Sequence, residues 1–179
     1  MDFIRINIPG QPLKDVKPSD LGTGIKATII DYGVEAGIIG RRITNDYTDG
    51  ELLMCVGHSG NPDWFRWLQS QGGLSGTRGG IKKEFSKDLD RSLVYAVSQG
   101  HHEIAATLFG MGAKPGSQVH WLLYVAIRKG RHEMAELLFG KGGEIKPYSR
   151  QQECIQYADE RMKKIIEKGM IESIRRRFS

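Results

Sequence analysis

A segment of fourteen residues occurs twice in this chain, and equivalent positions of the two copies are thirty residues apart. Residues 100–113 read Gly-His-His-Glu-Ile-Ala-Ala-Thr-Leu-Phe-Gly-Met-Gly-Ala, and residues 130–143 read Gly-Arg-His-Glu-Met-Ala-Glu-Leu-Leu-Phe-Gly-Lys-Gly-Gly. Upstream, Leu93–Val97 aligns with Leu123–Ile127, so each unit consists of an apolar helix, a glycine and a second apolar helix. Self-similarity at such a period is typical of stacked repeats, whose units bury their apolar faces only against neighbours.

Two further copies of the unit are more diverged. Residues 53–56 and 60–73 form an earlier copy, separated from the next by one period and a ten-residue insertion. For the last copy we predict a first helix over 149–157 and a second over 159–168, closed by Gly169. Its polar composition is typical of a terminal unit that caps a stack.

The repeated pattern Gly-His-x-Glu-Ile/Met-Ala-x-x-Leu-Phe-x-x-Gly-Ala/Gly resembles the second half of the ankyrin repeat. The matching positions are Gly100, His101, Glu103, Ile104, Leu108, Gly112 and Ala113, then Gly130, Glu133, Leu137, Leu138 and Gly142. The resemblance covers about residues 50–168, and it implies a mainly α protein with an ankyrin-like helix-pair solenoid of three to four repeats. The family's Thr-Pro-Leu-His opening is absent, because 91–94 and 121–124 read Arg-Ser-Leu-Val and Trp-Leu-Leu-Tyr.

The chain divides into three predicted parts. Residues 1–48 form a small β element that caps the stack, with a strand over 3–8 and a β-hairpin over 25–43. Residues 49–169 hold the repeats with an insertion over 74–87, and residues 170–179 form a basic C-terminal tail. A β element with a ligand of its own is the alternative for the N-terminal part.

Positive charge is concentrated at the C-terminal end. Residues 161–179 contain seven Lys or Arg and two Glu, so their net charge of +5 equals that of the whole chain. One interpretation is a solvated helix end, where cations favour the helix dipole. The other is a contact for nucleic acid or an acidic protein surface, made by Lys163, Lys164, Lys168, Arg175, Arg176 and Arg177.

No catalytic residue, cofactor or metal ligand is predicted. The pairs at 102–103 and 132–133 resemble the start of a zinc-protease helix, but Ala106 and Glu136 stand where a second histidine is required. Because His102 and His132 recur at the repeat period, we expect them to cap the second helices and to reach a neighbouring unit.

The two cysteines and the absence of long apolar runs bear on location. Cys55 and Cys154 both lie in apolar helical contexts, so free buried thiols are favoured over a disulfide. No apolar run approaches eighteen residues and no signal peptide is recognisable, so we predict a cytoplasmic protein without membrane contact.

The resemblance implies two partner-binding surfaces, the exposed side of the first helices and the inter-repeat loops. The residues predicted there are Tyr95, Gln99, Trp121, Tyr124 and Arg128 on helices, and Arg78, Lys82 and Lys83 in the insertion. For Trp121 and Tyr124, packing between repeats is an equal alternative.

The resulting hypothesis is a non-enzymatic protein–protein interaction module, such as an inhibitor or adaptor that occludes its partner. A nucleic-acid-associated protein that uses the basic C-terminal helix and the loop 76–87 is the alternative. An enzyme with its site in the N-terminal element is the third hypothesis.

Overall fold

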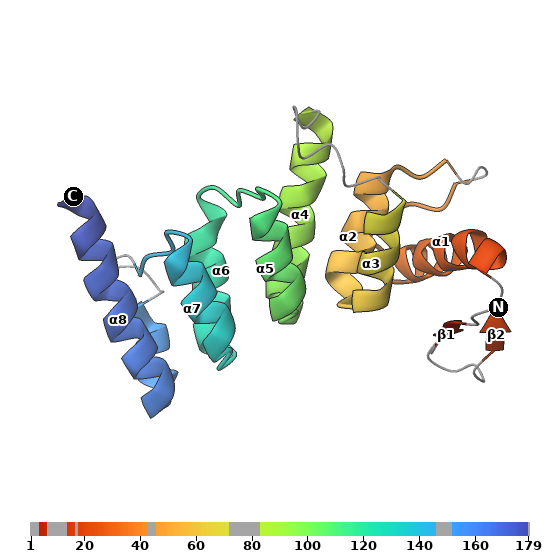
Figure 1. Ribbon diagram of the computed structural model, residues 1–179. Coiled ribbons are helices and arrows are strands. Elements are labelled where there is room, and N and C mark those ends of the chain that lie inside the picture. Colours follow the sequence, from red (N-terminus) through yellow and green to blue (C-terminus); the bar gives the residue numbers. More distant parts are fainter. Residues whose placement is uncertain are drawn as a thin grey trace.

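The chain is mainly helical. The computed structural model describes residues 4–6, 14–16, 18–42, 46–71, 83–145 and 152–178. In chain order the elements are β1 (Ile4–Ile6), β2 (Lys14–Val16), α1 (Pro18–Glu35), α2 (Asp49–Ser59), α3 (Pro62–Ser70), α4 (Lys83–Gln99), α5 (His102–Gly110), α6 (Gln118–Arg128), α7 (His132–Gly140), the 3₁₀ helix η2 (Gln152–Tyr157) and α8 (Glu160–Arg177). They follow one another along an elongated row (Figure 1).

Helices come in consecutive pairs, and the pairs pack side by side. The first helices α2, α4 and α6 contact one another in turn, followed by η2, while the second helices α5, α7 and α8 form a parallel row. The equivalent residues Leu53, Leu93 and Leu123 of the first helices are all fully buried. The same holds for Leu68, Leu108 and Leu138 of the second helices. Equivalent positions of the sequence repeat therefore build one continuous apolar core.

A side-chain-to-backbone hydrogen bond recurs at the thirty-residue period. The Lys114 amide donates to Asp90 Oδ1 at 2.6 Å, and the Glu144 amide donates to His120 Nδ1 at 3.0 Å. In both units a polar side chain of the first helix fixes the chain that follows the second helix. Each bond satisfies a backbone amide outside regular structure.

A second set of polar links joins neighbouring units. The Arg131 guanidinium donates to the carbonyl oxygens of Val97, Ser98 and Gln99 at 2.7, 2.8 and 2.9 Å, which are the last carbonyls of α4. One repeat earlier, His101 Nε2 donates to the His58 carbonyl oxygen at 3.1 Å, near the end of α2. Carbonyls at a helix C-terminus lack intrahelical partners, so a cation there also favours the helix dipole.

The N-terminal part differs from the prediction. The β-hairpin expected over 25–43 is wrong, because Pro18–Glu35 forms the helix α1, which packs against α2 and α3. Ile25, Ile29 and Gly33 recur every four residues, and Gly33 lies so close to Cys55 that an added methyl would overlap its sulfur. Burial of this face outweighs the strand preference of the β-branched run.

Within the strand predicted over 3–8, the structure describes residues 4–6, which form β1. Ile4–Ile6 pairs antiparallel with Lys14–Val16, with Arg5 opposite Asp15. The turn expected at Pro9–Gly10 lies outside the described residues.

The C-terminal boundaries also differ from the prediction. α8 runs from Glu160 to Arg177 without ending at Gly169, so residues 170–177 are helix and not a tail. For the first helix of this unit, expected over 149–157, the structure has the 3₁₀ helix η2; residues 149–151 lie outside the described residues. In the insertion, α4 begins at Lys83, so 83–87 is helix and not loop.

Gly169 is required by the contact between α8 and α7. A methyl group at this position would overlap the buried ring of Phe139, whereas a methyl at Gly140 meets nothing within 4 Å. We expect Gly169→Ala to lower the free energy of unfolding by about 1–3 kcal/mol, because overpacking forces the helices apart. Gly140→Ala is the matched control and is expected to be neutral or slightly stabilising. Urea unfolding of both variants measures the difference, and equal stabilities would contradict this packing.

Candidate functional site

Four polar and aromatic residues from three helices meet on the first-helix side of the stack. We call Tyr32 of α1, His58 of α2, and Tyr95 and Gln99 of α4 the His58 cluster. The Tyr32 hydroxyl lies 2.7 Å from His58 Nδ1, and Gln99 Nε2 lies 3.2 Å from His58 Nε2. The Tyr95 ring meets the imidazole edge to face, with centroids 5.5 Å apart. The cluster links three elements through one imidazole.

The hydrogen bonds of His58 define its tautomer. An amide nitrogen only donates, so His58 Nε2 accepts from Gln99 and its Nδ1–H donates to the Tyr32 hydroxyl. Burial, and then the neighbouring His101, lower the pKa of His58 below its ordinary value of 6.5. The neutral imidazole is therefore the form that this site favours.

Sequence reasoning placed Tyr95 and Gln99 at the site but missed His58 and Tyr32. Alignment of the repeats could have indicated His58. It lies two residues before Gly60, just as the predicted Arg128 lies two residues before Gly130. No signal was available for Tyr32, because its helix α1 was not predicted.

The next first helix, α6, carries the other three predicted residues. The Trp121 side chain is 50% exposed, so the alternative that it is a core residue is wrong. Tyr124 is half-buried against the core, and its hydroxyl accepts a hydrogen bond of 3.1 Å from Arg128. Tyr124 therefore combines packing with an accessible edge, and it positions the exposed guanidinium of Arg128.

The basic residues of the insertion are only partly placed. Arg78 and Lys82 lie outside the described residues. Lys83 is the first residue of α4, which places it at a helix start and not in a loop.

Several cations of α8 interact with groups of the chain itself. Lys163 pairs with Glu160 at 2.7 Å, Arg176 donates to the Phe139 carbonyl at 2.9 Å, and Arg177 pairs with Glu144 at 2.6 Å. The hydrogen bonds from Arg177 and then Ser173 lower the pKa of Glu144. All six predicted contact residues are exposed, and Lys163, Arg176 and Arg177 among them bind within the chain.

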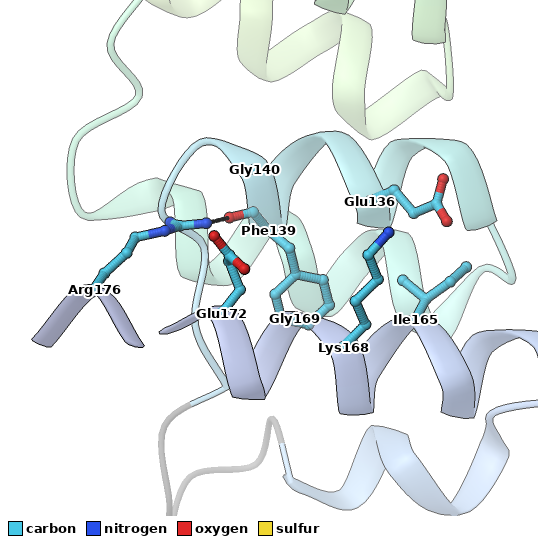
Figure 2. Close-up of a pocket in the computed structure, with 8 residues that line it drawn as sticks. All are labelled: Glu136, Phe139, Gly140, Ile165, Lys168, Gly169, Glu172 and Arg176. Carbon is cyan, nitrogen blue, oxygen red and sulfur yellow. Dashed lines mark hydrogen bonds between the residues drawn. The ribbon is translucent and has the colours of Figure 1, made fainter. Parts of the chain in front are cut away.

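A groove of about 460 Å³ lies between α7 and α8. Figure 2 shows Phe139 and Ile165 among its lining residues, with the carboxylates of Glu136 and Glu172 and the cations of Lys168 and Arg176 around them. The Arg176 guanidinium turns toward the Phe139 carbonyl, to which it is bonded. Gly140 and Gly169 complete the lining of the groove.

The repeated histidines have structural contacts. His132 Nε2 lies 2.9 Å from Asp159 Oδ2 at the start of α8, which confirms the predicted link to a neighbouring unit. The backbone amide of Met162 and then His132 lower the pKa of Asp159. His102 is exposed, and the adjacent His101 makes the link in its unit. Among the described residues, no group of three or more His, Cys, Asp or Glu is arranged to hold a metal ion.

The thiol of Cys55 is buried beside α1. Burial, and then the charge of Glu51, raise its pKa to about 12. A thiol with this pKa is not a thiolate at neutral pH and is a poor nucleophile. The side chain of Cys154 lies outside the described part of the chain.

Comparison with protein-family models, curated proteins and solved structures finds no match to this chain. Within the described ranges, no helix has the length and apolar character needed to span a membrane.

The lowered pKa of His58 predicts a pH dependence of stability. The unfolded chain takes up a proton near pH 6.5 but the folded site resists it, so the free energy of unfolding falls as pH drops below 6.5. We expect this fall to be smaller in His58→Gln, which keeps polar groups without the titration. The exposed His102→Gln is the control and retains the wild-type pH profile. Urea unfolding between about pH 7.5 and 5 checks this, and identical profiles for the wild type and His58→Gln would contradict it.

Proposed function

We propose that this chain is a non-enzymatic protein-binding module of ankyrin-like architecture that binds its partner through the exposed side of the first helices. The single observation that carries the proposal is the half-exposed indole of Trp121 on a regular helix. Large aromatic side chains held on rigid elements are the typical energetic centres of protein interfaces. The pairwise packing of helices at a thirty-residue period supports the architecture.

The surface next to Trp121 suits a protein partner. Arg128 bonded to Tyr124 gives a positioned guanidinium beside an aromatic ring, and both residue types are enriched in interface hot spots. The His58 cluster extends the same side of the stack through α4 and α2 toward α1. Because these side chains are already fixed by contacts with one another, little ordering would oppose binding. A partner that binds here would contact several units of the stack. Such a broad contact would occlude part of the partner's surface, as an inhibitor or adaptor requires.

A non-enzymatic role fits the chemistry of the described residues. The buried Cys55 thiol has a raised pKa, and His101 and His132 bond to neighbouring units. The thiol and imidazole groups, which are common catalytic groups in enzymes, thus have structural surroundings here.

The alternative, a nucleic-acid-associated protein, draws on the basic end of α8. Lys164, Lys168 and Arg175 are exposed there, and phosphate contacts would give binding that weakens steeply with salt. Generic duplex DNA and single-stranded RNA are the probes. Salt-sensitive binding that is lost in Lys164→Gln/Lys168→Gln, with Trp121→Ala unaffected, would favour this alternative over the protein-binding proposal.

The proposal predicts that Trp121 contributes to binding and not to folding. Partners captured by a photo-crosslinker at position 121 would be purified and their affinity measured by calorimetry. We expect Trp121→Ala to weaken binding at least about tenfold, since hot-spot residues contribute about 2 kcal/mol or more. Its melting temperature should stay close to that of the wild type, because half of the side chain is already exposed. Thr107→Ala, at an exposed position of α5, is the control and should bind normally. Unchanged affinity in Trp121→Ala would contradict the proposal.

A further inference from the structure

Charge is distributed unevenly along the first helices. Residues 53–62, 93–102 and 123–132 are equivalent segments that include the C-terminal ends of α2, α4 and α6, and none of them contains Asp or Glu. Every Asp and Glu of α2 and α4 lies in the N-terminal half of its helix, and α6 has none. The third segment contains three cations that we call the basic turn: Arg128, Lys129 and Arg131.

The hydrogen bonds of the basic turn leave most of its positive charge uncompensated. Arg128 donates to the Tyr124 hydroxyl at 3.1 Å, and Lys129 Nζ donates to the Ser98 carbonyl oxygen at 3.3 Å. Arg131 donates to carbonyl oxygens at the end of α4, so the acceptors of all three cations are uncharged groups. Helix C-termini carry about half a negative charge each, so the ends of α4 and α6 offset about one positive charge and leave about two.

Carboxylates from the second helices are bound elsewhere or lie in the other row. Glu133 of α7 pairs with Arg161 at 2.7 Å, and Asp159 at the start of α8 binds His132 at 2.9 Å. Glu103 is exposed at the start of α5, in the row of second helices. The positive charge of the basic turn is therefore available on the exposed side of the first helices.

This charge lies on the same side of α6 as its exposed indole. Trp121 and Arg128 are seven residues apart, which is close to two helical turns, so they project from one side at a separation of about 10 Å along the axis. Trp121 is 50% exposed, and Arg128 is exposed as well. Tyr124 lies between them and holds the guanidinium. One regular helix thus presents an apolar anchor and a positioned cation.

We propose that the exposed side of the first helices binds an acidic segment of a protein partner. An apolar side chain of that segment packs on Trp121, and its carboxylates pair with Arg128 and Lys129. Arg128 retains donors besides the one bonded to Tyr124, and a guanidinium pairs well with a carboxylate. This inference rests on the protein-binding function proposed above and adds the chemical class of the partner.

The state of the aromatic side chains disfavours single-stranded nucleic acid as the occupant. Proteins that bind such strands use successive aromatic rings on which bases stack. The Tyr95 ring meets His58 edge to face, and Tyr124 is half-buried against the core. Among the described side chains of α2, α4 and α6, Trp121 is the only aromatic one that is exposed. A single ring beside two cations fits an apolar residue followed by carboxylates better than a row of bases.

Selection of a displayed library of random peptides on the whole chain tests the inference. We expect enriched peptides to combine an excess of Asp and Glu with an apolar residue. Their affinity, measured by calorimetry at low salt, should fall at least about tenfold in Trp121→Ala and in Arg128→Gln/Lys129→Gln. The effect of the charge substitutions should shrink as salt is added, because salt screens exposed charges, whereas a structural effect would persist.

A matched control separates local charge from the net charge of the chain. Lys164→Gln/Lys168→Gln removes the same amount of charge from exposed positions of α8 and should leave peptide affinity unchanged. Circular dichroism and melting temperatures should show wild-type folding in all variants, because the substituted side chains are exposed.

The outcomes distinguish this inference from the function on which it rests. Peptides that depend on Trp121 but have no acidic excess, or that bind Arg128→Gln/Lys129→Gln with full affinity, would overturn the inference and leave the protein-binding proposal standing. A selection that yields no peptide dependent on Trp121 would contradict both. The inference would also fail if acidic peptides do not bind while single-stranded RNA, phosphatidylserine vesicles or a second copy of the chain binds in a manner lost in Trp121→Ala.

Discussion

Burial between neighbouring helix pairs is the interaction on which the rest of this structure depends. The helices α5 and α7 have nine residues each, a length that is not stable in isolation in water. Their stability comes from leucines at equivalent positions, such as Leu108 and Leu138, which are fully buried. Arg131 adds a polar link, because its guanidinium satisfies three carbonyls at the end of the preceding unit's first helix. Burial lowers the pKa of this guanidinium. The three carbonyl oxygens replace the water molecules lost on burial and so offset the cost of desolvation.

The sequence repeat predicted the helix pairs because period and apolar pattern are local properties. It failed for α1, where the β-branched run Thr28–Ile30 favours a strand locally and only packing against α2 decides for helix. The prediction that Gly169 ends the last helix was also wrong. In a sequence, a glycine that ends a helix looks the same as a glycine within a helix that leaves room for a neighbouring ring, here that of Phe139. At the candidate site, Tyr95, Gln99, Trp121, Tyr124 and Arg128 were expected from the resemblance, which implies a partner surface on the exposed side of the first helices. His58 and Tyr32 meet across 26 residues, a contact that no spacing reveals.

The buried leucines that recur in each unit hold the stack, whereas some positions at which the units differ face outward. Trp121 illustrates the difference, because its equivalents are Arg91 and Glu51. Glu51 caps α2 and Arg91 lies near Asp88, whereas Trp121 presents half of its surface to solvent. The same holds at the end of the row, where Met170, Ile171 and Ile174 of α8 are exposed. One repeated scaffold thus carries different exposed side chains in different units.

The central claim, that each unit depends on its neighbours, is tested most directly by hydrogen exchange in Arg131→Ala. The account predicts faster amide exchange in α4 as well as in α6 and α7, because removing the link uncouples two units. Arg128→Ala, which removes an exposed guanidinium bonded to Tyr124, should leave the exchange of these helices unchanged. Faster exchange confined to the few residues around position 131 would contradict the claim.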